Sequence, residues 1–265
     1  PPSPFYNGAW PPLARSSGVQ PRVLFGERGV FTAEQVRQAI RPKLYYLAHT
    51  GLVCLENTHN AAGGRIWPLS VAREILEVAH AQGIPVHLDG ARIFNASVAT
   101  GIPVSELVLG FDSVMFCLSK GLGCPVGSLL CGSREFIEEA RRVRKALGGG
   151  MRQAGILAAA GLYALEHHVE RLAEDHENAR ILAQGLSEIP CLSVTPPETN
   201  IVIVEILRGP TAAELAERLK RRGVLVAPAG AGTEARKLRL VTHLDVSRED
   251  ILRTIDLFWE ELRGV

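Results

Sequence analysis

A lysine that follows an apolar segment is the residue of this sequence best placed for covalent chemistry. Lys120 comes directly after the apolar run 113–118 and Ser119, and it precedes the Gly-Leu-Gly of residues 121–123. A partly buried amine loses its proton more readily, and a neutral amine is what attacks an aldehyde to form an imine. Lys120 is therefore a candidate for imine formation, with an ordinary loop lysine as the alternative interpretation.

A carboxylate lies at the end of the preceding apolar run, as Lys120 does after its own. Asp89 ends the run 84–89 and precedes Gly-Ala-Arg. In pyridoxal phosphate (PLP) chemistry a carboxylate keeps the pyridine nitrogen protonated, so that the ring draws electrons from the substrate Cα. The alternative is a helix N-cap. His87 shares the strand face of Asp89, as a metal pair would, but no third ligand is identified and we expect no metal site.

The elements that must position these residues alternate along the first part of the chain. Almost unbroken apolar runs predict strands at 52–56, 84–89, 113–118 and 127–131. Between them, residues 70–82 predict a helix that ends at Gly83, with Val71, Ile75, Val78 and Ala79 on its apolar face. A capping box at 32–35 begins a short helix, and 135–145 predicts another. This alternation indicates an α/β fold around a mostly parallel sheet.

The pattern changes after the glycines at 148–150. Helical periodicity covers 153–166 and 169–186, and predicted strands follow at 192–194, 200–206, 224–227 and 238–242. A capping box at 211–214 begins a further helix, and a final helix is predicted from 247 to about 262. We expect an irregular N-terminal segment over 1–40, a large α/β domain over 41–152, and connecting helices with a smaller C-terminal α+β domain over 153–265.

Composition narrows the class of protein. Hydrophobic residues make up 46% of the chain and charged residues 22%, as in folded proteins, and the net charge of +1 gives no bias toward nucleic acid or membranes. The longest apolar run, 155–165, is shorter than the roughly 20 residues that span a bilayer. Five scattered cysteines without a CxxC pair suit a reducing compartment, and we expect a cytoplasmic protein. They are Cys54, Cys117, Cys124, Cys131 and Cys191.

Five segments together resemble the threonine aldolase family. They read LENTHN (55–60), HLDGARIFNA (87–96), CLSKGLGCPVGSLL (117–130), GGGMRQAGILAAAGLYAL (148–165) and LRLVTHLDVSRE (238–249). The resemblance extends over nearly all of the chain from about residue 40. It implies the aspartate-aminotransferase-like fold of PLP enzymes (fold type I), with 41–152 as a remnant of the PLP-binding large domain.

The resemblance also implies a role for each matched residue. Lys120 would hold PLP as a Schiff base, and Asp89 would contact the pyridine nitrogen. Arg92 would lie by the cofactor and the substrate carboxylate. The remaining cofactor contacts would come from Ser119 and Arg152 at the phosphate. Arg239 would clamp the substrate carboxylate, Glu56, Thr58, His59 and Asn60 would form the pocket floor, and His59 is the further catalytic candidate.

The activity implied by the resemblance is that of a carbon–carbon lyase (aldehyde-lyase) in a homo-oligomer, a dimer or tetramer. It cleaves L-threonine or L-allo-threonine by a retro-aldol reaction to glycine and acetaldehyde. Residues 1–40 lack the Ser/Thr-Gly-Thr phosphate loop and the ring-stacking histidine of the family, and Tyr46 takes the place of a pocket histidine, with His49 three positions away. A truncated, catalytically incompetent homologue with weak PLP binding, and a related PLP β-eliminating lyase, are therefore the alternatives.

Overall fold

The computed structural model describes residues 15, 17–229 and 235–265. The irregular structure expected at 1–14 lies outside these described residues, and 18–31 contain no helix or strand beyond a bridge between Glu27 and Val30. The chain forms two compact units, Pro1–Val169 and Glu170–Val265.

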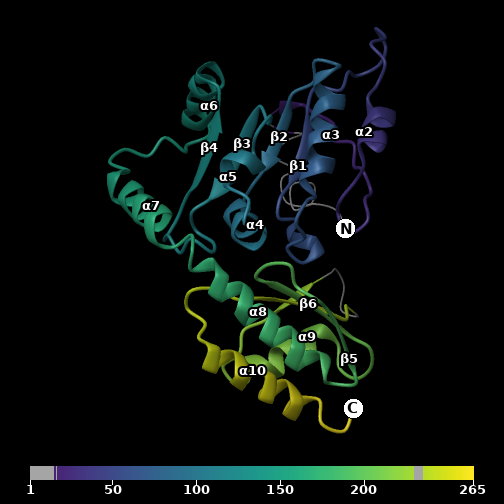
Figure 1. The fold of residues 1–265 in the computed structure, drawn as a ribbon, viewed down its shortest axis with the longest axis vertical. Coiled ribbons are helices and arrows are strands. Elements are labelled where there is room, and N and C mark those ends of the chain that lie inside the picture. The colour runs from purple at the N-terminus through teal and green to yellow at the C-terminus, as the bar shows by residue number, and fades with distance from the viewer. Residues whose placement is uncertain (1–14, 16, 230–234) are drawn as a thin grey trace. The chain divides into compact units, whose positions relative to one another are not determined.

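The first unit is built on the expected mostly parallel sheet (Figure 1). Its strands β1 (Val53–Glu56), β2 (Val86–Asp89) and β3 (Ser113–Cys117) are parallel, and β4 (Ser128–Gly132) is antiparallel to β3. The order along the sheet is β1-β2-β3-β4. Parallel strands end at one edge, so the segments that follow β1, β2 and β3 are brought to the same edge of the sheet.

Two helices of this unit lie close to the positions that capping and periodicity predicted. Helix α2 (Ala33–Ala39) begins at the capping box of Thr32 and Gln35 and packs on α3 (Leu69–His80). The buried residues of α3 are Ala72, Ile75, Leu76 and Ala79. Its buried face is thus shifted from the predicted one, because Val71 and Val78 are only partly buried at its margin.

Sequence reasoning missed the structure between β2 and β3. Residues 93–107 form α4 (Ile93–Thr100) and α5 (Val104–Leu107). Gly101 ends α4 with a positive φ of 71°, and Pro103 precedes α5. The apolar residues of α4 lie on all its sides, so the segment has too weak a helical period to be predicted.

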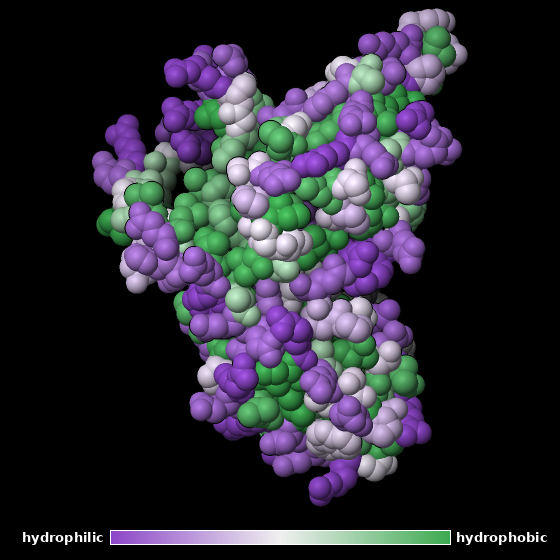
Figure 2. Space-filling model, in the orientation of Figure 1, coloured by the Kyte–Doolittle hydropathy of each residue, from purple (hydrophilic) through white to green (hydrophobic). Residues whose placement is uncertain are grey.

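The antiparallel edge of the sheet differs from the buried strand that its apolar sequence predicted. Every residue of β4 is exposed, and none of α6 (Arg134–Ala146) is buried. Figure 2 shows apolar side chains gathered along β4. An apolar run predicts burial against some partner, and within this chain β4 has a partner strand on one side but little covering its faces. Exposed large apolar residues of β4, α6 and α7 (Gly155–His167) are Leu129, Leu130, Phe136, Val143, Ile156, Leu162 and Tyr163.

The second unit is an α+β unit with its own core. Its antiparallel sheet has the order β5-β6-β8-β7, from β5 (Leu192–Thr195), β6 (Ile201–Ile206), β7 (Ala227–Ala229) and β8 (Lys237–Val241). Helices α8 (Leu172–Ser187), α9 (Ala212–Arg221) and α10 (Arg248–Glu261) pack with it around fully buried Phe258 and Leu215. The strand predicted at 224–227 is wrong in its bounds, because β7 begins only at Ala227. Val224 belongs to the end of α9, where its N–H donates to the Leu219 carbonyl.

Candidate active site

Asp89 lies at the last position of β2, where its backbone and side chain are both fixed. Its ladder partner on β1 is Glu56, and the Asn57 N–H donates to the Asp89 carbonyl at 2.9 Å. The Ala91 N–H donates to carboxylate oxygen Oδ1 at 3.0 Å. Among the described residues no hydrogen bond reaches the other oxygen, Oδ2. Helix α4 has Arg92 as its N-cap, so the alternative role of Asp89 as a helix cap is excluded.

Lys120 follows the neighbouring strand, as the sequence predicted, but it is exposed rather than partly buried. Its amine lies 3.2 Å from the Cys117 thiol, with which it forms a weak hydrogen bond. Ser119 is exposed as well, and its hydroxyl is 3.5 Å from the Gly127 carbonyl oxygen. The loop that carries Lys120 and Ser119 therefore leaves both side chains exposed to solvent within this unit.

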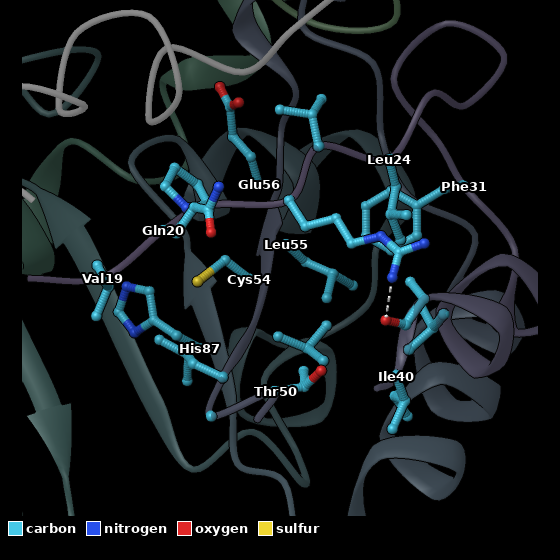
Figure 3. A pocket seen from close by; sticks show the side chains of 18 of the residues that line it. Val19, Gln20, Leu24, Phe31, Ile40, Thr50, Cys54, Leu55, Glu56 and His87 are labelled. Carbon is cyan, nitrogen blue, oxygen red and sulfur yellow. Dashed lines mark hydrogen bonds between the residues drawn. The ribbon is translucent and has the colours of Figure 1, made fainter. Parts of the chain in front are cut away.

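A cavity of about 1180 Å³ runs along β1, of which all four residues line it, and extends to His87 and Asp89 of β2. Cys54, Glu56, His87 and Asp89 lie on one face of the sheet, because residues two apart share a strand face. In Figure 3 the Cys54 sulfur and the His87 ring point into the same part of the cavity. Residues 18–24 and 48–52 form much of the remaining wall.

The segment after β1 forms a buried polar cluster. Glu56 Oε1 accepts the Asn60 N–H at 2.9 Å, and Asn60 Oδ1 accepts a guanidinium N–H of Arg92 at 3.1 Å. His59 Nε2 lies 3.9 Å from Glu56 Oε2. Burial lowers the pKa of His59 to about 4, so its imidazole is neutral at pH 7. Thr58 is also buried, and these residues form one wall around the end of β1, as expected of a pocket floor.

The two other predicted arginines belong to other elements of the chain. Arg152 is exposed in the connection between α6 and α7. Arg239 lies on β8 in the second unit, paired in register with Ile203 and Ala227. It is partly buried, and burial lowers the pKa of its guanidinium. Arg239 is not on an edge strand, because β8 lies between β6 and β7.

The residues of the first unit fit PLP in type and placement. A carboxylate that is fixed through one oxygen can accept a ring N–H at the other, and the lysine that would attach the cofactor follows the adjacent strand. Asp89, Glu56 and His59 line the cavity, whereas Lys120, Ser119 and Arg92 do not. Across the described residues, no group of three or more His, Cys, Asp or Glu side chains is placed to hold a metal ion. Among the described helices, none combines the length and the hydropathy needed to cross a membrane.

Sequence reasoning missed three residues at this site. Cys54 was counted only among the scattered cysteines, yet its sulfur faces the cavity. Ser113, which bonds His87, and Cys117, which bonds Lys120, were counted only as strand residues. Alternation along β1 and β2 could have revealed Cys54, since it is two residues before Glu56. Contacts between strands, such as that of Ser113, depend on the register and leave no local signal.

Comparison with known proteins assigns the chain to a family. Residues 11–208 match the family model described as beta-eliminating lyase. The chain is 40% identical over 257 residues to low-specificity L-threonine aldolase 1 of Arabidopsis thaliana, covering 94% of this chain and 71% of that protein. It is 46% identical over 223 residues to low specificity L-threonine aldolase of Escherichia coli (strain K12), covering 84% of this chain and 64% of that protein.

Solved structures support the fold type I architecture. The structure of Leishmania major threonine aldolase superposes with a TM-score of 0.80 at 15% identity, covering 98% of this chain and 75% of that one. PLP enzymes are among the other solved structures that share this fold, and PLP is the cofactor that the family implies. The family model and the level of identity together place this chain in the beta-eliminating lyase family, within its threonine aldolase group.

Proposed function

We propose that this chain binds PLP and cleaves the Cα–Cβ bond of β-hydroxy-α-amino acids, L-threonine and L-allo-threonine among them, to glycine and an aldehyde. The observation that carries this proposal is the Asp89 carboxylate, fixed through Oδ1 beside a large cavity and one strand away from the loop of Lys120. When bound, PLP supplies an electron sink for the electron pair left on Cα by the bond cleavage.

Lys120 and Asp89 have the central roles in the proposed site. The Lys120 amine would hold the cofactor covalently. Asp89 accepts the hydrogen bond of the pyridine N–H, and its negative charge keeps that nitrogen protonated. Because the Ala91 N–H holds Oδ1, the carboxylate cannot rotate freely away from the cofactor.

Arginines orient the phosphate and the substrate in this proposal. Arg239 and Arg92 bind the substrate carboxylate, for which a planar guanidinium offers two parallel donors. Arg152 and Ser119 bind the cofactor phosphate. Asn60 holds the Arg92 side chain at 3.1 Å, and Glu56 holds the Asn60 backbone, so the pocket floor orients an arginine.

His59 is the proposed acceptor of the β-hydroxyl proton. Burial lowers its pKa to about 4, so it is neutral at pH 7, as a proton acceptor must be. Its Nδ1 is buried and has no hydrogen-bond partner among the described residues. Glu56, 3.9 Å from Nε2, can stabilise the charge that forms when Nδ1 takes a proton.

The test is a product assay on the purified chain with PLP and L-threonine or L-allo-threonine. Glycine and acetaldehyde in equal amounts support the proposal. Formation of a 2-oxo acid and ammonia instead would identify a β-eliminating lyase, the second candidate that the name of the family model favours. PLP binding without any product would identify a catalytically incompetent homologue. A Lys145→Ala variant, changed at an exposed lysine of α6, serves as a control for Lys120→Ala.

We also propose that the active form is a homo-oligomer in the cytoplasm. Exposed apolar side chains of β4, α6 and α7, Ile156 at 84% exposure among them, are the kind of surface that a partner subunit covers. All five cysteines are unpaired, which suits a reducing compartment. Light scattering after size-exclusion chromatography tests the oligomer, and Ile156→Lys should shift it toward the monomer.

A further inference from the structure

His87 is the side chain nearest in sequence to Asp89 on the same face of β2, and the proposed chemistry does not use it. The two residues are two positions apart, so both side chains leave the strand on the cavity side. The negative charge of Asp89 raises the pKa of His87, which reflects their proximity. Burial has the larger and opposite effect, and the net pKa is lowered, so the imidazole is neutral at pH 7.

Ser113 fixes the orientation of this imidazole. It is the ladder partner of His87 on β3, it is only 7% exposed, and its hydroxyl oxygen lies 2.8 Å from His87 Nδ1. A hydrogen bond at one ring nitrogen fixes the direction of the other nitrogen. Nε2 is thereby held at a constant position on the cavity face of the sheet.

Strand β1, which lies beside His87 and Asp89, brings no positive charge to this pair. Cys54, the ladder partner of His87 on β1, has its pKa raised to about 12 by burial and by Asp89, so it is a neutral thiol. The other charged or titratable side chains that line the cavity are Arg22, Arg41, His49, Glu56 and His59. The Arg22 guanidinium donates to the Ala39 carbonyl at 2.8 Å, at the end of α2.

We propose that His87, held by Ser113, is a positioning residue for Asp89. Its neutral imidazole packs beside the carboxylate, limits its rotation and excludes water, so that the Asp89 charge remains available to the pyridine nitrogen of the cofactor. A cation at this position would compete with that nitrogen for the carboxylate. The inference rests on the proposed function, because it requires PLP beside Asp89.

The first measurement needs no cofactor. The ring nitrogens of His87 are followed by NMR in the ¹⁵N-histidine-labelled chain during a pH titration, with His87→Gln used to assign the signals. Asp89→Asn should lower the pKa of His87, because it removes the negative charge that raises it. Ser113→Ala should change the ratio of the two tautomers. If neither variant alters the His87 signals, the three side chains are not coupled and the inference is overturned.

The second measurement asks whether the effect reaches the pyridine nitrogen. Affinities are measured for PLP and for 1-deaza-PLP, in which C–H replaces the ring nitrogen. Ser113→Ala should weaken PLP binding by about 2- to 10-fold, the effect of one net hydrogen bond, and leave 1-deaza-PLP binding unchanged. Ser113→Thr, which keeps the hydroxyl, should restore the PLP affinity. Ser97→Ala, at a serine bonded to the Ile102 carbonyl in the same unit, is the matched control.

The outcomes separate the inference from the proposed function. Equal loss of affinity for both compounds in Ser113→Ala would mean a structural role only, and it would overturn the inference while leaving PLP binding established. Unchanged PLP affinity in Ser113→Ala would also overturn the inference, because Ser113 would then have no effect at the cofactor. If the unsubstituted chain binds neither compound, the proposed function is refuted, and the role of His87 at the cofactor is refuted with it.

Discussion

Asp89→Asn isolates the charge of Asp89 from its structural role. Asparagine keeps an oxygen that accepts the Ala91 N–H, which in the native chain is 3.0 Å from Oδ1. The hydrogen bond from the Asn57 N–H to the backbone carbonyl of residue 89 does not involve the side chain. We therefore expect the fold and its melting temperature to be nearly unchanged.

The expected loss follows from the kind of hydrogen bond removed. A charge-assisted bond contributes about 1.5–3 kcal/mol and a neutral bond about 0.5–1.5 kcal/mol, so the substitution should weaken PLP binding by about 1–2 kcal/mol, or roughly 5- to 30-fold. The loss in kcat should be larger, because an unprotonated pyridine nitrogen draws electrons from Cα less strongly. PLP affinity and chemistry thus change by different factors.

Absorbance titration with PLP and the threonine cleavage assay measure these two factors. Asp112→Asn is a matched control, because Asp112 accepts the Val86 N–H at 2.7 Å at the start of β2, away from the proposed cofactor. It should reduce stability without a selective effect on PLP. An Asp89→Asn variant that binds PLP and cleaves threonine as well as the parent would refute the role of this carboxylate.

Three further predictions test the other residues. Lys120→Ala should abolish the borohydride-stable attachment of PLP seen by mass spectrometry, and an unchanged adduct would move the attachment to another lysine. Arg239→Lys should raise KM for amino acids by roughly 10- to 100-fold at unchanged PLP affinity, since a point charge replaces a bidentate fork, and an unchanged KM would favour Arg92 as the clamp. His176 is 4% exposed and burial lowers its pKa from 6.5 to about 4. The unfolded chain therefore binds this proton first, and acidification from pH 6.5 to 4 should cost about 3 kcal/mol of stability, measured by urea unfolding. His176→Gln should reduce that acid dependence, whereas His167→Gln, at an exposed site, should not.

The helix capping boxes show how reliably local chemistry predicts structure in this chain. Thr32 and Thr211 each cap a helix as predicted, because the side-chain bonds involved span only three residues. Helix α4 was missed for the opposite reason, since apolar residues on all its sides remove the period that signals a helix. The segment that begins at Val224 has a strand-like sequence, but the Val224 N–H donates to the Leu219 carbonyl at the end of α9.

By itself the sequence determined the α/β class, the order of the strands along the chain and the placement of Asp89 and Lys120 just where strands end. These features are local, because apolar runs, caps and glycine stops act over a few residues. Only the tertiary structure decided that β4 is antiparallel and exposed, that Asp89 is fixed by Ala91 and is not a helix cap, and that His87 meets Ser113. Strand direction, register and burial depend on residues far apart in the chain, and a single sequence carries no local signal for them.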